Sequence, residues 1–181
     1  MTSIIKADNI STVSGSGSIT IPTGVKVVGT DSGSIVAPGH VLQVSHTNLT
    51  GNSPISTSTQ HPTTVNVGSA VSFTPKLANS KLLVTVSGNM KMTSGAQGCF
   101  VGVKRDGTYV DFGASQDAAM FIYMASTTVN HHQSSSSTVM IDASSTNATS
   151  FQVVYARYGG SGTAEVGNWH GVHLTIQEIA Q

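Results

Sequence analysis

The sequence predicts an all-β protein in two parts: an elongated β-structured shaft or anchor over residues 1–75, and an antiparallel, jelly-roll-like β-sandwich knob over residues 76–181. Apolar and polar residues alternate in several segments, and no window of a dozen residues has the three-to-four spacing of a helix. Charged residues make up only 9% of the chain, so Ser, Thr, Asn and Gly must form most of its surface. Near residue 75 the predicted strands lengthen and most aromatic residues begin to appear.

The first part contains a Gly- and Ser-rich stretch in which Ile, Val and Pro recur, "SGSGSITIPTGVKVVGTDSGSIVAPG". Gly17-Ser18-Ile19 returns as Gly33-Ser34-Ile35, and a proline follows each copy. Units this short cannot bury their own apolar side chains, and identical copies of the chain are the simplest neighbours. The sequence therefore predicts a symmetric homo-oligomer. The expected interchain shaft core includes Ile19, Ile21, Val25, Val27 and Ile35.

The polar stretch that follows, "TNLTGNSPISTSTQHPTT", contains two prolines and is expected to be a loop or an extended segment. Beyond it, "KLLVTVSGNMKM" alternates and predicts a strand with one buried face. Asp106-Gly107 lies between the alternating runs "CFVGVK" and "TYVDF". Both residues tolerate positive φ, so this pair predicts a tight hairpin turn.

The remaining segments also favour strands. "SQDAAMFIYMA" has room for one helical turn, but its second half has the pattern of a strand. "FQVVYARY" and "GVHLTIQEI" alternate clearly. The residues expected on the buried faces of these two segments and of "KLLVTVSGNMKM" are Leu82, Val84, Val86, Phe151, Val153, Tyr155, Val172, Leu174 and Ile176.

Charge and cysteine content exclude several classes of protein. Eight basic residues balance eight acidic ones, which gives no electrostatic footprint for nucleic acid. Cys99 is the only cysteine, so no internal disulfide forms, and its apolar neighbours favour a small buried side chain rather than a nucleophile. No stretch has the pattern of a signal peptide or the length of a membrane span. We therefore expect synthesis in a cytoplasm and no membrane insertion.

Candidate metal and catalytic residues are sparse. The chain has seven histidines, but the neighbours His131 and His132 would point to opposite faces of a strand, as would His170 and His173. Neither pair has a Cys or carboxylate at ligand spacing. The sequence thus predicts no metal site within one chain and no cofactor, while a site shared around a symmetry axis stays open. It contains no G-x-S-x-G nucleophile elbow and no pair of carboxylates within a recognisable catalytic motif, so we expect no enzymatic activity.

Aromatic side chains are the candidates for receptor binding. An apolar ring with a polar edge suits a pyranose, although plain core packing is the common alternative. Tyr155 fits the core, whereas Tyr158 and Trp169 adjoin the Gly-rich loop "YGGSGTAEVGNW". The predicted receptor contacts are Tyr158, Trp169, His131 and His132.

With these features, the chain resembles the tail-fibre and related appendage proteins of tailed bacteriophages, particularly those of aquatic and marine hosts. The resemblance lies in "ADNIS" and "GSGSITIPTGVKVVGTDSGSIVAPGHVLQV" in the first part, and in "SKLLVTVSGNMKM" and "GVHLTIQEIA" in the second. It implies a homotrimer with a narrow shaft or attachment part, a β-sandwich knob and a role in host-surface binding. Full fibres are often far longer, so the resemblance indicates a short fibre, a fibre tip or a capsid-bound appendage.

Three functions remain at this point. The first is a trimeric virion adhesin that attaches to other virion proteins through its N-terminal region and binds a host glycan or envelope protein. The second is a capsid decoration (cement) protein that stabilises the phage head and binds no receptor. The third, a glycan-degrading enzyme, requires an acidic pair that the sequence does not offer.

Overall fold

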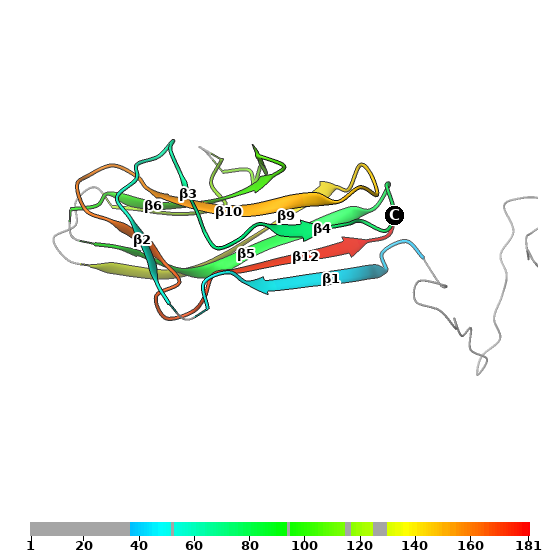
Figure 1. Ribbon diagram of the computed structural model, residues 1–181, viewed down its shortest axis with the longest axis horizontal. Coiled ribbons are helices and arrows are strands. Elements are labelled where there is room, and N and C mark those ends of the chain that lie inside the picture. The colour runs from blue at the N-terminus through cyan, green and yellow to red at the C-terminus, as the bar shows by residue number, and fades with distance from the viewer. Residues whose placement is uncertain (1–36, 52, 94, 115–116, 125–129) are drawn as a thin grey trace, which may run out of the picture. The chain divides into compact units, whose positions relative to one another are not determined.

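The computed structural model describes residues 37–181 except 52, 94, 115–116 and 125–129. Its compact unit, Val36–Gln181, consists of two antiparallel six-stranded sheets packed as a β-sandwich (Figure 1). This confirms the predicted all-β class. Sheet A contains β1 (Val41–Asn48), β2 (Ile55–Thr57), β5 (Lys81–Met92), β9 (His131–Asp142), β11 (Ala164–Val166) and β12 (His173–Ile179). Sheet B contains β3 (Val65–Asn66), β4 (Val71–Phe73), β6 (Gly98–Arg105), β7 (Thr108–Tyr109), β8 (Met120–Tyr123) and β10 (Thr149–Arg157).

One long strand organises each sheet. In sheet A, β5 pairs with β9 on one side and with β12 and β11 on the other, and β1 and β2 lie outside these two. In sheet B, β6 pairs with β7 and β8 on one side and with β10 on the other, and β3 and β4 lie outside β10. No described segment forms a helix of the length and apolarity needed to cross a membrane.

The core lies between the sheets, where the sequence alternation places it. All nine predicted core positions of the three alternating segments are buried, and Cys99 is also fully buried. Met120 and Ile122 of β8 are buried as well, which confirms a strand in the second half of "SQDAAMFIYMA". The hydrophobic effect on these alternating faces therefore fixes which side of each strand faces inward.

The predicted Asp-Gly turn joins β6 and β7. Asp106 and Gly107 have φ values of 49° and 86°, and Arg105 lies opposite Thr108 across the turn. The Asp106 carboxylate accepts hydrogen bonds from the Thr149 hydroxyl and from the Ser150 N–H, the latter at 2.8 Å. These two bonds, the Thr149 bond foremost, hold the pKa of Asp106 below its ordinary value. Asp106 thus serves both the turn and the attachment of the turn to β10.

The compact unit begins earlier than the predicted boundary between residues 75 and 76. Strands β1 to β4 all precede that boundary, yet β1 pairs with β12, β2 with β11, and β3 and β4 with β10. Three of these four strands are only two or three residues long. Gly and Pro separate the short apolar segments that contain them, and the sequence analysis assigned this composition to a shaft. The proposed shaft residues Ile19, Ile21, Val25, Val27 and Ile35 lie outside the described residues.

The polar stretch before β3 covers part of the outer face of sheet B. His61 packs on Phe100 with ring centroids 4.6 Å apart, and the Gln60 region forms a parallel bridge with Arg157. Phe100 forms a second small core with Ala118, Val154 and Ala156. This cover explains why β6 is buried on both faces along Gly98–Val103.

A buried carboxylate joins β12 to the turn before β5. Glu178 is fully buried and accepts hydrogen bonds from the N–H groups of Lys76 and Leu77, from the Ser80 hydroxyl at 2.7 Å and from the Gln43 amide at 2.7 Å. Burial acts to raise the pKa of Glu178, but these hydrogen bonds outweigh it and hold the pKa below its ordinary value. Glu178 is therefore a charged structural clamp.

Candidate functional site

The sandwich has two distinct ends, defined by the ends of β5. At the near end, Lys81 pairs with Ile179 and Asp142, and the Gly39 N–H donates to the Ala180 carbonyl at 2.8 Å. At the far end, Met92 pairs with His131 and Ala164. Twelve residues of β5 separate the two ends by about 36 Å, at about 3.3 Å per residue. The described chain starts at the near end, and the far end lies at the opposite end of β5.

An exposed tryptophan lies at the far end. Trp169, in the loop after β11, stacks on His132 of β9 with ring centroids 4.2 Å apart and ring planes within 9° of parallel. The Trp169 side chain is nevertheless 65% exposed. One face of the indole is therefore supported by the imidazole while much of the remaining surface is open to solvent. Such a preorganised aromatic surface is suited to stacking against a flat ligand.

The structure separates the two neighbouring histidines. His132 lies opposite Lys91, whose side chain is on the outer face of sheet A, whereas His131 lies opposite Met92, which is buried on the inner face. Successive side chains of a strand point to opposite faces, so only His132 reaches Trp169. Of the four predicted receptor contacts, the fold brings together Trp169 and His132.

The loop that carries Trp169 is held at both ends. Its first residue, Gly167, has φ 77° and donates its N–H to the Asn89 carbonyl at 2.9 Å. At its other end, the Val172 N–H donates to the Thr50 hydroxyl at 2.9 Å, and the Val172 carbonyl accepts from the Leu49 N–H at 2.7 Å. A side chain at position 167 would meet the Thr50 hydroxyl at 2.5 Å, so the close approach requires glycine. These contacts position Trp169 on the sheet.

Polar side chains lie on the sheet beside the ring pair. Lys91 and Glu165, opposite each other on β5 and β11, form an ion pair of 2.8 Å with both side chains largely buried. Asn89 is 2% exposed and donates a weak bond of 3.4 Å to the Ser134 hydroxyl, while its Oδ1 has no hydrogen-bond partner among the described residues. The same holds for Nδ1 of His132. This end of sheet A therefore combines an aromatic surface with hydrogen-bonding groups and an ion pair of zero net charge.

Tyr158 belongs to a different surface at the far end. It extends the pairing of β10 with β6, because its N–H donates to the Gly98 carbonyl at 2.9 Å. Its ring makes edge contacts with Phe121 at 5.0 Å and with Tyr123 at 6.0 Å between centroids. Phe121 and Tyr123 are both exposed large aromatic residues, so these three form an aromatic patch on sheet B. Tyr158 and Trp169 thus lie on opposite sheets.

The predicted receptor contacts do not include Phe121, Tyr123, Lys91, Glu165 or Asn89. A signal for the first two is present in "MFIY", because burial of Met120 and Ile122 sends the intervening aromatic residues outward. No comparable signal exists for the other three, since the pairing of β5 with β11 and with the loop after it becomes visible only in the fold.

The other histidines do not form a metal centre in the part of the chain that the structure describes. His46 and His173, on neighbouring strands β1 and β12, stack at 5.2 Å, and Nδ1 of His46 lies 2.8 Å from the Thr175 hydroxyl. Burial, followed by the charges of His46 and His170, lowers the pKa of His173. No group of three His, Cys, Asp or Glu side chains in the described ranges has a geometry that could hold a metal ion.

Cys99 is also unsuited to nucleophilic chemistry. Complete burial raises the pKa of its thiol to about 12, so the thiolate that would attack a substrate is not formed near neutral pH. The position of Cys99 in the core agrees with its predicted role as a small buried side chain.

Comparison with solved structures finds similarities to viral particles. No family model matches the chain, and no curated protein matches it. Among solved structures, the chain is similar to infectious bursal disease virus-derived T=1 particles (14% identity, TM-score 0.38, covering 87% of this chain and 41% of that one). It is also similar to the VP2 subviral particle of that virus (14%, 0.38, 87% and 42%) and to the virus of the Gx strain (16%, 0.35, 85% and 42%). The chain thus spans about two fifths of the length of each of these chains.

Proposed function

We propose that this chain is a structural protein of a virion, a short tail fibre or fibre tip, that binds a glycan on the host surface through its far end. It acts as a homotrimer that attaches to other virion proteins through its N-terminal region. The resemblance of the sequence to phage appendage proteins supports the viral role. The observation that carries the binding role is the exposed Trp169 stacked on His132 at the end opposite the near end.

The position of the ring pair supports this function. An attachment protein needs its binding surface away from the point at which it is anchored, and β5 spaces the two ends by about 36 Å. Residues 1–36 join the described chain at the near end. Within the described chain, the ring pair thus lies at the end away from this junction, as a host-facing surface requires.

The chemistry of the far end favours a sugar. The open part of the Trp169 ring offers apolar contact to the C–H groups of a pyranose. The Lys91–Glu165 pair, whose side chains are 15% and 16% exposed, offers both signs of charge for hydroxyl groups. Single sites of this kind bind weakly, and three copies on one trimer would raise the avidity for a repeating surface glycan.

The proposal predicts that Trp169→Ala weakens binding of the labelled protein to host cells by at least about tenfold, equivalent to about 1.4 kcal/mol. The ring supplies the stacking surface, and because it is mostly exposed, its removal leaves the thermal unfolding temperature nearly unchanged. Binding is measured by flow cytometry and on a panel of host polysaccharides. Trp169→Tyr, which keeps an aromatic face, is expected to retain part of the affinity.

A matched control is Tyr123→Ala, which removes an exposed aromatic residue at the same end but on sheet B. It should bind like the wild type. If Tyr123→Ala abolishes binding while Trp169→Ala does not, the receptor site lies on the aromatic patch. Absence of cell binding by the wild-type trimer would contradict the adhesin role itself.

We propose binding without cleavage. Incubation with host polysaccharide should release no reducing sugar. Release of sugar that is lost in Glu165→Gln, the carboxylate closest to the site in the register of sheet A, would overturn this part of the proposal.

A capsid decoration protein is the second candidate, and one observation favours it. Val44 and Met140 are both more than half exposed, and they lie in one cross-strand row of sheet A through Gln177 and Leu83. Exposed aliphatic side chains in a row favour a protein contact. Immunogold labelling of purified particles separates the candidates, because label on tail appendages supports the adhesin and label over the head supports decoration.

A further inference from the structure

An ion pair lies in the same cross-strand row as the ring pair at the far end. His132, Lys91 and Glu165 lie opposite one another on β9, β5 and β11. Ser56 of β2 follows on the other side of Glu165, so the two charges of the row face each other. Directly opposite side chains of neighbouring strands are about 5 Å apart at Cβ. The ion pair is therefore the immediate neighbour of the imidazole on which Trp169 stacks.

The surroundings of this row do not add an unpaired charge to it among the described residues. The next row on the outer face of sheet A, Ser134 opposite Asn89, is uncharged. Arg157, a second far-end cation, lies on sheet B and donates from its guanidinium to the Gly160 carbonyl and to the side-chain oxygen of Gln60. An anion beside the ring pair thus meets the lysine of the row only together with its carboxylate.

Such a pair treats neutral and acidic sugars differently. A hydroxyl group is both donor and acceptor, so the hydroxyls of a neutral pyranose can accept from Lys91 and donate to Glu165. A carboxylate or sulfate only accepts, and it loses water to lie beside a carboxylate of its own sign. The lysine does not offset this cost, because its charge is already neutralised by Glu165 at 2.8 Å. The row therefore favours neutral ligands.

We propose that Glu165 determines the specificity of this site: its pairing with Lys91 restricts the site to neutral hexopyranose glycans and excludes uronic acids, sialic acids and sulfated sugars. The inference rests on the glycan-binding function proposed above and adds which class of glycan is bound. Trp169 supplies affinity through its exposed ring, whereas the ion pair supplies selection by charge. Removal of the carboxylate alone leaves a lysine without its counter-charge, which turns a neutral site into one that accepts anions.

Matched polymers test the selection. Dextran, mannan and galactan are each compared with their carboxymethyl derivative, because the two forms share one backbone and differ in charge. The labelled full chain should bind at least one neutral polymer about tenfold more tightly than its derivative. Glu165→Gln should lower this ratio by about tenfold or reverse it, since Lys91 then attracts the added carboxylates. Measurement at pH 8 keeps imidazole charge out of the comparison, because free histidine titrates at about 6.5.

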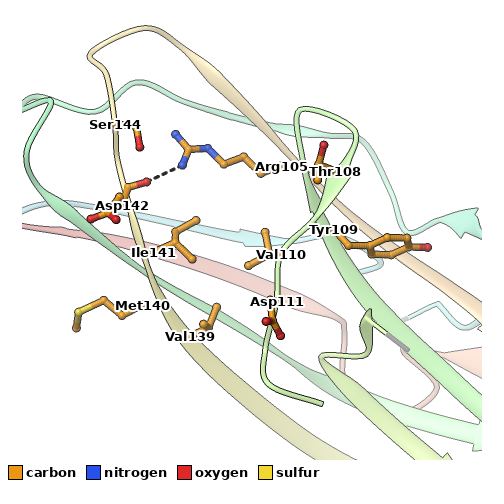
Figure 2. A pocket seen from close by; sticks show the side chains of 10 residues that line it. All are labelled: Arg105, Thr108, Tyr109, Val110, Asp111, Val139, Met140, Ile141, Asp142 and Ser144. Atoms are coloured by element: carbon orange, nitrogen blue, oxygen red, sulfur yellow. Dashed lines mark hydrogen bonds between the residues drawn. The ribbon is translucent and has the colours of Figure 1, made fainter. Parts of the chain in front are cut away.

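Asp142→Asn is the matched control, because it removes the carboxylate partner of Lys81 and so changes the net charge by the same amount at the near end. Asp142 lines a cavity of about 380 Å³ there, and Figure 2 shows Arg105 donating to it; the acceptor is the Asp142 carbonyl, at 2.7 Å. The substitution therefore makes this hollow more basic. A gain in anion binding that depended on net charge alone would appear here too, whereas we expect the wild-type ratio.

Lys91→Met acts in the opposite direction. It keeps the aliphatic stem and leaves Glu165 as an unpaired anion, so its preference for the neutral polymers should exceed that of the wild type. Lys91→Glu with Glu165→Lys exchanges the two charges and should keep the neutral preference. Thermal unfolding verifies that each variant is folded. A wild type that prefers the carboxymethyl polymers, or one ratio shared by wild type, Glu165→Gln and Lys91→Met, would overturn the proposal.

The salt dependence of cell binding separates this inference from the function on which it rests, and it requires no knowledge of the glycan. Binding of the wild type to host cells should change by less than about twofold between about 0.05 and 0.5 M NaCl, because salt screens charge but not ring stacking. Trp169-dependent binding that falls steeply with salt would overturn the neutral specificity and leave the adhesin role standing. Absence of Trp169-dependent binding at every salt concentration would contradict the proposed binding site, and this inference with it.

Discussion

Glu178 shows how much one residue can contribute to this sandwich. Its carboxylate is fully buried, yet four groups from Gln43, Lys76, Leu77 and Ser80 donate to it. A buried charge is tolerated only when such donors replace the water that it lost. The fold therefore depends on this carboxylate being ionised.

Glu178→Gln keeps the shape of the side chain but removes the charge. We expect the free energy of unfolding at neutral pH to fall by about 1–3 kcal/mol, measured by urea denaturation. Because the folded pKa lies below the ordinary value of 4.5, the charge stabilises fully above 4.5 and the effect is lost as pH falls through the folded pKa. The difference between wild type and variant should shrink accordingly.

Asp142→Asn is the control for this prediction, since its carboxylate is mostly exposed and has a single ion-pair partner, Lys81. Its effect on stability should be about 1 kcal/mol or less. Equal effects of the two substitutions would contradict the clamp role of Glu178.

A second prediction at the scale of the residue concerns Gly167, the first residue of the loop that carries Trp169. Gly167→Ala must adopt φ 77° and also meets the Thr50 hydroxyl at 2.5 Å, whereas Gly39→Ala, at φ 84°, has open space around it. Thermal unfolding should show Gly39→Ala costing about 1 kcal/mol and Gly167→Ala about 1–3 kcal/mol more, because only the latter displaces the Thr50 side chain. Equal costs would mean that the loop shifts without penalty.

At the scale of the element, β5 carries a leucine on each of its two faces. Leu82 is fully buried in the core, and Leu83, its neighbour, is on the outer face in the Val44 and Met140 row. Leu82→Ala is expected to lower the free energy of unfolding by about 2–5 kcal/mol, and Leu83→Ala by about 1 kcal/mol or less. Chemical denaturation of both variants measures this, and similar losses would argue against the one-sided burial of β5.

The elements also show what alternation can and cannot predict. The segments with long alternating runs, such as β5 and β12, were predicted with the correct buried face, because burial on one face imposes a period of two. The short strands β2, β3 and β4 were not predicted as strands, since two or three residues cannot display a period. Their conformation is set by the unpaired edges of β10 and β11 that they satisfy.

At the scale of the whole molecule, the prediction is a trimer. Light scattering on the purified full chain should give a mass three times the 18.6 kDa of one chain, because the short repeated units expected in the shaft cannot bury their own apolar side chains. Ile19→Asp with Ile21→Asp should reduce this mass. A stable wild-type monomer at micromolar concentration would contradict the predicted trimer.

The candidate site could be predicted only in part. Trp169 and His132 were both selected from the sequence, but their stacking was not, because it joins a loop to a strand 37 positions earlier in the chain. His131 was grouped with them although the strand sends it to the inner face, and Tyr158 was grouped with them although it lies on the other sheet. Choosing residue types is a matter of chemistry, whereas bringing them together requires the pairing of distant strands.

The sequence by itself determined the β class, the Asp106-Gly107 turn and the inward faces of the long strands. These features are local, because they follow from backbone preferences and from the period of the apolar residues. Only the tertiary structure decided that β1 to β4 belong to the sandwich, that Glu178 is buried as a charge and that β9 pairs with β5. Those outcomes depend on hydrogen bonds between residues far apart in the chain, and the local sequence does not indicate which distant residues will pair.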